Sequence, residues 1–112
     1  AHVLHPYISA VLRLRHTHGI AADDVVRIDC PVAAFIIGIV CEPTDEKWEP
    51  RTTSHGRVSL QFSLAEALAT GRLAKDAYSE AVRHDPAILA LARRIQYRHE
   101  PHDRGCATTV RP

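Results

Sequence analysis

The chain is organised around residues 47–71, which read Lys47-Trp-Glu-Pro-Arg-Thr-Thr-Ser-His-Gly-Arg-Val-Ser-Leu-Gln-Phe-Ser-Leu-Ala-Glu-Ala-Leu-Ala-Thr-Gly71. A polar, proline-containing loop is followed by a segment in which few polar residues interrupt leucine, phenylalanine and alanine. A helix that is apolar on nearly every side is usually buried at the centre of a domain. Ser59 can cap its first turn, and Gly71 can end it in the left-handed conformation. The stretch therefore predicts a central buried helix between Ser59 and Gly71, with the rest of the chain packed around it.

Size and composition indicate one folded domain over residues 1–112, because 46% of the 112 residues are hydrophobic. Fourteen basic and thirteen acidic residues are interspersed and give a net charge of +1. This balance provides no electrostatic reason to expect nucleic acid or a membrane surface as partner. The longest apolar run, Val32–Cys41, is too short to span a bilayer, and no signal peptide is recognised. Three cysteines without paired spacing favour a reducing, cytoplasmic compartment.

The segments that precede residue 47 predict a helix followed by β structure. We expect a helix over about Pro6–His18, which proline can begin and a basic last turn can end. Val25–Cys30 alternates as a strand does, with Val26, Ile28 and Cys30 on one face. Pro31 lacks a backbone N–H, which predicts an edge strand or a bend at that point. The isoleucine and valine content of Val32–Val40 favours a strand over a short helix.

The remaining segments predict a loop, helices and a final hairpin. Glu42–Gly56 is expected to be loop, and Lys75–Arg83 a short helix. Asp85 and Pro86 are a capping acid and a first-turn proline, which begin another helix. The hairpin strands are Gln96–Glu100 and Cys106–Val110, joined by a turn at residues 103–105. This order indicates an α+β fold, with helices on one face of a small, mainly antiparallel sheet.

The sequence contains no strong signal for a metal site, a cofactor-binding motif or a nucleophilic cysteine. None of the eight histidines completes a tetrahedral zinc set with the usual spacing. No phosphate-binding loop or dinucleotide fingerprint occurs. Cysteines in apolar runs are more often inert buried thiols than nucleophiles. We therefore expect no metal and no organic cofactor.

Several segments resemble the MmgE/PrpD family, which includes 2-methylcitrate dehydratase, cis-aconitate decarboxylase and iminodisuccinate epimerase. The pattern of lysine, Pro-x-Thr, basic residue, serine and alanine-rich helix in residues 47–71 resembles the central signature of that family. Two positions depart from it, since Val58 stands where an aromatic residue is usual and Phe62 where tyrosine is common. The flanking segments that also resemble the family are residues 1–8, 19–28 and 85–92.

The resemblance implies that the chain is the smaller α+β lid domain of a longer two-domain enzyme, separated from a helical domain. Family reactions use proton abstraction next to a carboxylate, followed by loss of water, loss of carbon dioxide or reprotonation. The intact parent would then be a cofactor-independent lyase or isomerase of propionate metabolism or a related pathway, similar to 2-methylcitrate dehydratase, acting on a small di- or tricarboxylate. The isolated chain is expected to be catalytically inactive.

The resemblance also implies where the site residues lie. His2 and His5 are the candidate catalytic residues, and which of the two faces the active site remains open. Arg57, Ser59 and Gln61 are the candidate substrate-binding residues, at a helix N-terminus where backbone amides favour anions. The alternatives are structural, with histidine packing at the start of a helix and Ser59 acting only as a cap.

Two other functions are alternatives to the enzymatic one. The chain could be a stand-alone interaction or oligomerisation module without catalysis, or a histidine-based metal binder. A lid separated from its helical domain would expose apolar surface and self-associate, so a homo-oligomer is expected.

Overall fold

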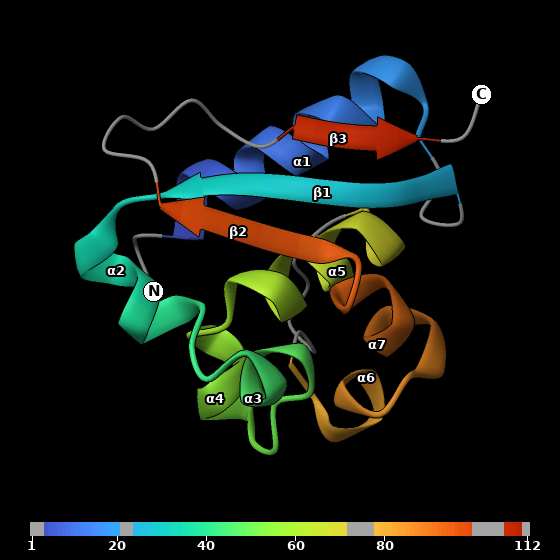
Figure 1. The fold of residues 1–112 in the computed structure, drawn as a ribbon. Helices are drawn as coiled ribbons and strands as arrows, with labels where there is room; N and C mark the ends of the chain where they lie inside the picture. Colours follow the sequence, from blue (N-terminus) through green and yellow to red (C-terminus); the bar gives the residue numbers. More distant parts are fainter. Residues whose placement is uncertain (1–3, 21–23, 72–77, 100–106, 111–112) are drawn as a thin grey trace.

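The computed structural model describes residues 4–20, 24–71, 78–99 and 107–110, and Figure 1 shows the arrangement of the elements. The fold is α+β, as expected, with helices packed beside one three-stranded sheet. No helix in these ranges is both long enough and apolar enough to cross a bilayer. The described elements are α1 (His5–His18), β1 (Val25–Val32), α2 (Ala34–Val40), α3 (Thr44–Trp48), α4 (Thr53–Arg57), α5 (Leu60–Thr70), α6 (Glu80–Arg83), α7 (Pro86–Ala92), β2 (Ile95–His99) and β3 (Ala107–Val110).

The sheet is mixed, with strand order β2-β1-β3, so the prediction of a mainly antiparallel sheet was wrong. β1 runs parallel to β2, with Ile28 opposite Ile95, and antiparallel to β3, with Asp29 opposite Ala107. The predicted hairpin was also wrong, because β1 lies between β2 and β3. A parallel pair needs a long crossover connection, and the helices α2 to α7 supply it between β1 and β2.

Pro31 lies in the middle strand of the sheet, so the expectation of an edge strand was wrong. The N–H of Ile28 donates to the carbonyl of Arg94 and therefore points toward β2. Backbone N–H groups point to alternate sides along a strand, so an N–H at residue 31, three residues after Ile28, would point toward β3. The described pairing of β1 with β3 ends at Asp29. The missing N–H of proline consequently removes no hydrogen bond from the described ladder, and the Pro31 carbonyl accepts one from the Tyr7 hydroxyl at 2.7 Å.

The start of β1 contains an irregularity that changes which valine is buried. The register with β3 shifts between Val25 and Arg27, as it does at a β-bulge. Val25 has no exposed surface, whereas Val26 is 48% exposed, which corrects the prediction for Val26. Downstream of the bulge the predicted face holds, because Ile28 and Cys30 are both fully buried.

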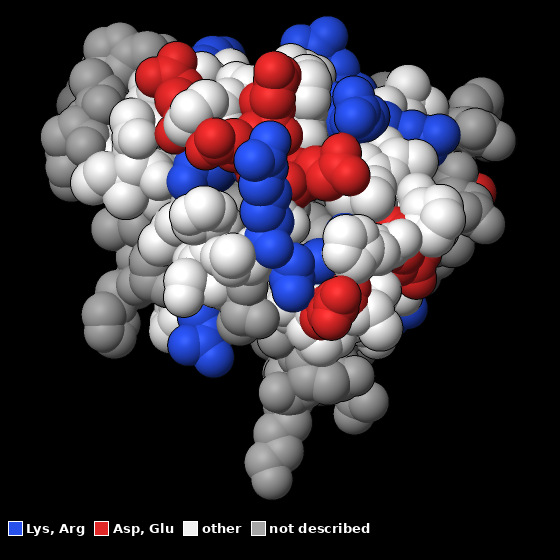
Figure 2. Space-filling model, turned by 90° about the horizontal axis from the view of Figure 1, so that it is seen from below, with Lys and Arg blue, Asp and Glu red and all other residues white. Residues whose placement is uncertain are grey.

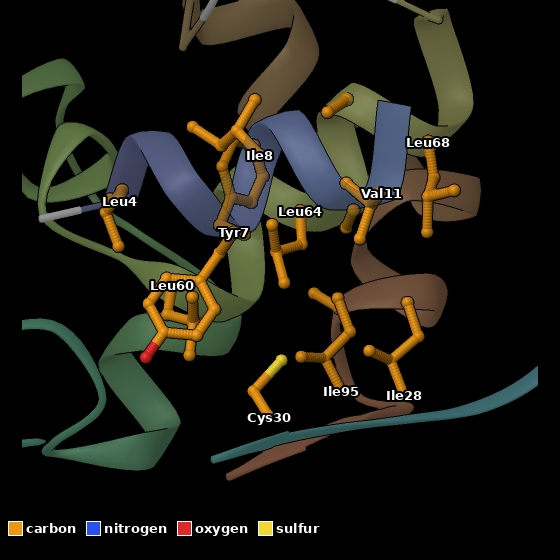
Figure 3. Close-up of a cluster of buried hydrophobic side chains, with 14 of the residues drawn as sticks. Leu4, Tyr7, Ile8, Val11, Ile28, Cys30, Leu60, Leu64, Leu68 and Ile95 are labelled. Carbon is orange, nitrogen blue, oxygen red and sulfur yellow. The ribbon is translucent and has the colours of Figure 1, made fainter. Parts of the chain in front are cut away.

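The central helix α5 has the predicted ends and the predicted burial. The Ser59 hydroxyl accepts a hydrogen bond from the Phe62 N–H at 3.0 Å, and Gly71 ends the helix with φ of 78°. Every residue from Leu60 to Leu68 is buried. Figure 3 shows side chains of α1 and α5 meeting Ile28 and Ile95 of the sheet. The core therefore forms between α5, its neighbouring helices and one face of the sheet.

The segment after β1 is helical, so the prediction of a strand over Val32–Val40 was wrong beyond its first residues. In α2, Ile36 and Val40 are buried, whereas Gly38 and Ile39 are exposed. Burial at a spacing of four residues is the helical period. High β propensity describes a preference for half-buried pleated surfaces, and here the tertiary environment overrides it.

The predicted loop Glu42–Gly56 contains two short helices, α3 and α4, so it was wrong as a structureless segment. Thr52 caps α4 by accepting a hydrogen bond from the His55 N–H at 3.1 Å. Of the predicted helix Lys75–Arg83, the described part is helical over Glu80–Arg83, while residues 75–77 and the turn at 103–105 lie outside the described residues. The Asp85 carboxylate caps α7 as predicted.

A test of this packing uses two glycines that lie in helices. A Cβ on Gly56 would come within 2.8 Å of the Tyr78 ring, whereas one on Gly38 would meet nothing within 4 Å. Gly56→Ala should therefore lower the free energy of unfolding by about 1–3 kcal/mol, the usual cost of overpacking. Gly38→Ala, the matched control, should raise it by about 0.5–1 kcal/mol through helix propensity. Urea denaturation of both variants measures the difference, and equal effects would contradict the described contact.

Candidate functional site

The five predicted site residues differ in exposure. His2 lies outside the described residues, and His5 is exposed as the first residue of α1. Arg57 is exposed as the last residue of α4. Ser59 and Gln61 have no exposed surface. The structure thus brings Arg57, Ser59 and Gln61 to the junction of α4 and α5, with the arginine outside and the other two inside.

Ser59 and Gln61 connect the N-terminus of α5 to the elements beside it. The Ser59 hydroxyl donates to the Lys47 carbonyl at 2.6 Å while it caps α5. The Gln61 side-chain amide donates from Nε2 to the Cys41 carbonyl at 3.1 Å. The buried Oε1 of Gln61 has no hydrogen-bond partner in the described part of the chain. These contacts hold the first turn of α5, and a substrate-binding role for both residues stays a prediction.

Sequence reasoning missed Lys47 and Cys41, which lie next to this turn. Lys47 was placed in a loop, yet it is only 8% exposed. Burial lowers the pKa of the Lys47 ammonium, against the opposing influence of Glu46 and Cys41. Burial also raises the pKa of the Cys41 thiol to about 12, so this thiol remains neutral at physiological pH. The available signal was the apolar run Val32–Val40 that precedes Cys41, which argued for a buried thiol.

Tyr78 ties the segment before α6 to α5 with an unusual backbone conformation. Its φ is 64°, a value that non-glycine residues seldom adopt. Its hydroxyl shares a hydrogen bond with Ser63 at 2.8 Å, and its N–H donates to the Glu66 carboxylate at 3.1 Å. Arg83 Nε donates to the Tyr78 carbonyl at 3.0 Å. These contacts keep the Tyr78 ring against Gly56, close to the junction that carries Arg57.

A concave site lies at the end of the molecule formed by α3, α4 and α6. Figure 2 views this end and shows acidic side chains gathered around basic ones. The cavity has a volume of about 320 Å³. Within the described ranges, no group of three or more histidine, cysteine, aspartate or glutamate side chains is placed to hold a metal ion. The cavity is lined by Asp45, Glu46, Glu49, Pro50, Arg51 and His84.

Comparison with known families identifies the chain. The model of the MmgE/PrpD C-terminal domain matches residues 1–105, which include all five predicted site residues. A comparison with curated proteins gave no match. The matched range contains the N-terminal segment, the helices α1 to α7 and the strands β1 and β2, and it confirms the family inferred from the signature around α5. The chain therefore belongs to the MmgE/PrpD family and represents its C-terminal domain.

Proposed function

We propose that this chain is the lid domain of an MmgE/PrpD lyase or isomerase that acts on a small di- or tricarboxylate, as 2-methylcitrate dehydratase does. The observation that carries the proposal is the family match over residues 1–105. The active site would lie where this domain meets the helical domain of the parent enzyme. The reaction would begin with removal of a proton next to a carboxylate, and loss of water is the preferred second step.

The proposed chemistry assigns roles to the residues of this domain. His2 or His5 would be the base, since a neutral imidazole accepts a proton near physiological pH. Arg57 would receive a substrate carboxylate, because its guanidinium lies on the exposed side of the α4–α5 junction. Ser59 and Gln61 would belong to the same site, where their hydrogen bonds to Lys47 and Cys41 hold the first turn of α5.

The cellular setting follows from the same proposal. Cys41 is a free and buried thiol, which suits a reducing compartment such as the cytoplasm. The partners would be the helical domain of the parent, a small carboxylic acid and a second copy of the enzyme. No metal or organic cofactor is proposed.

The test is turnover by the intact protein, in which this domain is joined to its helical domain. We expect conversion of 2-methylcitrate, cis-aconitate or a related acid in the presence of a metal chelator. His2→Ala or His5→Ala should lower kcat by about a hundred-fold, the usual scale for loss of a general base. His16→Ala, at an exposed position of α1, is the matched control and should leave kcat unchanged.

Two results would count against these assignments. Failure to convert any of these acids would reject the proposed function. Normal turnover that drops by less than a few-fold in both histidine variants would keep the function and reject these residues as the base.

A further inference from the structure

The guanidinium of Arg83 joins the two segments that adjoin α4. Arg83 is the last residue of α6 and is only 9% exposed. Its Nη1 donates to the carbonyl of Arg51 at 2.7 Å, and its Nε donates to the carbonyl of Tyr78 at 3.0 Å. Arg51 directly precedes Thr52, the N-cap of α4. A single buried side chain therefore fixes both the entry to α4 and the segment before α6.

Tyr78 carries this restraint to the other end of α4. Its φ of 64° is a strained value for a residue with a side chain, and the buried Glu66 carboxylate accepts a hydrogen bond from its N–H at 3.1 Å. A Cβ on Gly56 would come within 2.8 Å of the Tyr78 ring, so this ring lies directly against α4. Burial raises the pKa of the Tyr78 hydroxyl, and the nearby positive charge of Arg57 opposes that rise. The side chain of Tyr78 thus lies beside the last two residues of α4.

The helix α4 depends on these contacts for its orientation. It has five residues, whereas isolated helices shorter than about 12–15 residues are marginal in water. Its last residue, Arg57, has an exposed side chain, so the direction of that side chain follows from how the helix is held. Residues kept in rarely populated backbone conformations are common at ligand-binding sites, where the surrounding structure offsets the strain. The strained Tyr78, held by Arg83 and Glu66, supplies such a support beside Arg57.

We infer that Arg83 is a positioning residue for carboxylate binding, which holds α4 so that the guanidinium of Arg57 faces the substrate. The inference rests on the proposed function, in which Arg57 receives a substrate carboxylate. Arginine binds a carboxylate most strongly through two parallel hydrogen bonds, so the affinity depends on the direction of the guanidinium. Arg83 acts through Arg57 and does not contact the substrate, because its own Nε and Nη1 are buried against backbone carbonyls.

A double-mutant cycle in the intact protein tests this role. Arg83→Met removes both hydrogen bonds of the guanidinium and keeps a long apolar side chain. It should raise KM about ten-fold or more, as expected for a lost charged hydrogen bond, and leave kcat within about two-fold. In the Arg57→Ala background the same substitution should raise KM by less than about two-fold, because no guanidinium remains to be positioned. A residue with a merely structural role would lower activity equally in both backgrounds.

Two further variants serve as controls. Arg94→Met is the matched control, since Arg94 also donates to a backbone carbonyl, that of Val25 at 2.8 Å. It should leave KM unchanged. Arg83→Lys can still donate to one of the two carbonyls and should have a KM between those of Arg83→Met and the original protein. Circular dichroism checks that each variant is folded, and Arg83→Lys provides the cycle if Arg83→Met fails to fold.

Two outcomes would overturn the inference. The first is an unchanged KM in Arg83→Met, and the second is an equal effect of that substitution with and without the Arg57 guanidinium. The result is separable from the proposed function. If the intact protein converted none of the acids, the same cycle would be read from the dissociation constant of tricarballylate, a tricarboxylic acid without a hydroxyl group. Coupled binding without turnover would reject the reaction only, normal turnover without coupling would reject Arg83 only, and absence of both would reject both.

Discussion

Replacing Phe62 by alanine is expected to lower the free energy of unfolding by about 3–5 kcal/mol, the usual cost of removing a buried aromatic side chain. Phe62 is fully buried in α5, and its ring lies 6.2 Å from the ring of Tyr78. The substitution removes that contact and leaves a cavity that the neighbouring helices cannot close. Because domains of this kind are stable by only about 5–15 kcal/mol, the loss would remove much of the total.

Urea denaturation followed by circular dichroism measures this effect. Ile39→Ala is the matched control, since it also shortens a large hydrophobic residue in a helix, but at a position that is 56% exposed. The control should change the free energy of unfolding by no more than about 0.5 kcal/mol. If both variants lost the same small amount, α5 would not be the centre of the core.

The second large effect concerns alkaline pH and the buried Cys41 thiol. Its pKa rises from 9.0 to about 12 on folding, chiefly because burial disfavours the thiolate. Above pH 9 the unfolded chain releases the thiol proton, while the folded protein retains it up to about pH 12. The stabilising contribution of the neutral thiol is therefore complete below pH 9 and declines as pH rises toward 12. Three pKa units correspond to roughly 4 kcal/mol.

Comparison with Cys41→Ala isolates this contribution, because tyrosines, lysines and arginines titrate in both proteins. The difference in unfolding free energy between the original chain and Cys41→Ala should be constant between pH 7 and pH 8. It should then shift against the original chain by about 1.4 kcal/mol for each pH unit above 9. A difference that stays constant up to pH 11 would mean that the Cys41 thiol is accessible to solvent in the folded state.

Function could be anticipated from the sequence only as far as the family. The order and spacing of the residues in the α5 signature were sufficient for the MmgE/PrpD assignment, which the match over residues 1–105 confirms. The site residues were harder to predict from the sequence than the family, because the exposure of a side chain depends on which elements cover it. Nothing in the local sequence distinguishes exposed Arg57 from fully buried Gln61, four positions away.

Lys47 illustrates the same limit from the opposite direction. Lysine in a polar, proline-containing stretch predicts a solvated side chain. Lys47 lies in the short helix α3, which packs against α5 and is joined to it by the hydrogen bond that Ser59 donates to the Lys47 carbonyl. These contacts join residues that are twelve positions apart in the chain. A pattern read along one segment could not reveal them.

The sequence by itself determined local features, namely where helices begin and end. Ser59 and Gly71 set the ends of α5, and Asp85 set the start of α7, because caps act on backbone groups within four residues. What only the tertiary structure decided was which segments meet. β2 pairs in parallel with β1 and does not form the expected hairpin with β3. The segment α2 is a helix despite its β-branched residues. Strand partners and burial depend on contacts between distant segments, and the burial of Lys47 arises from such contacts.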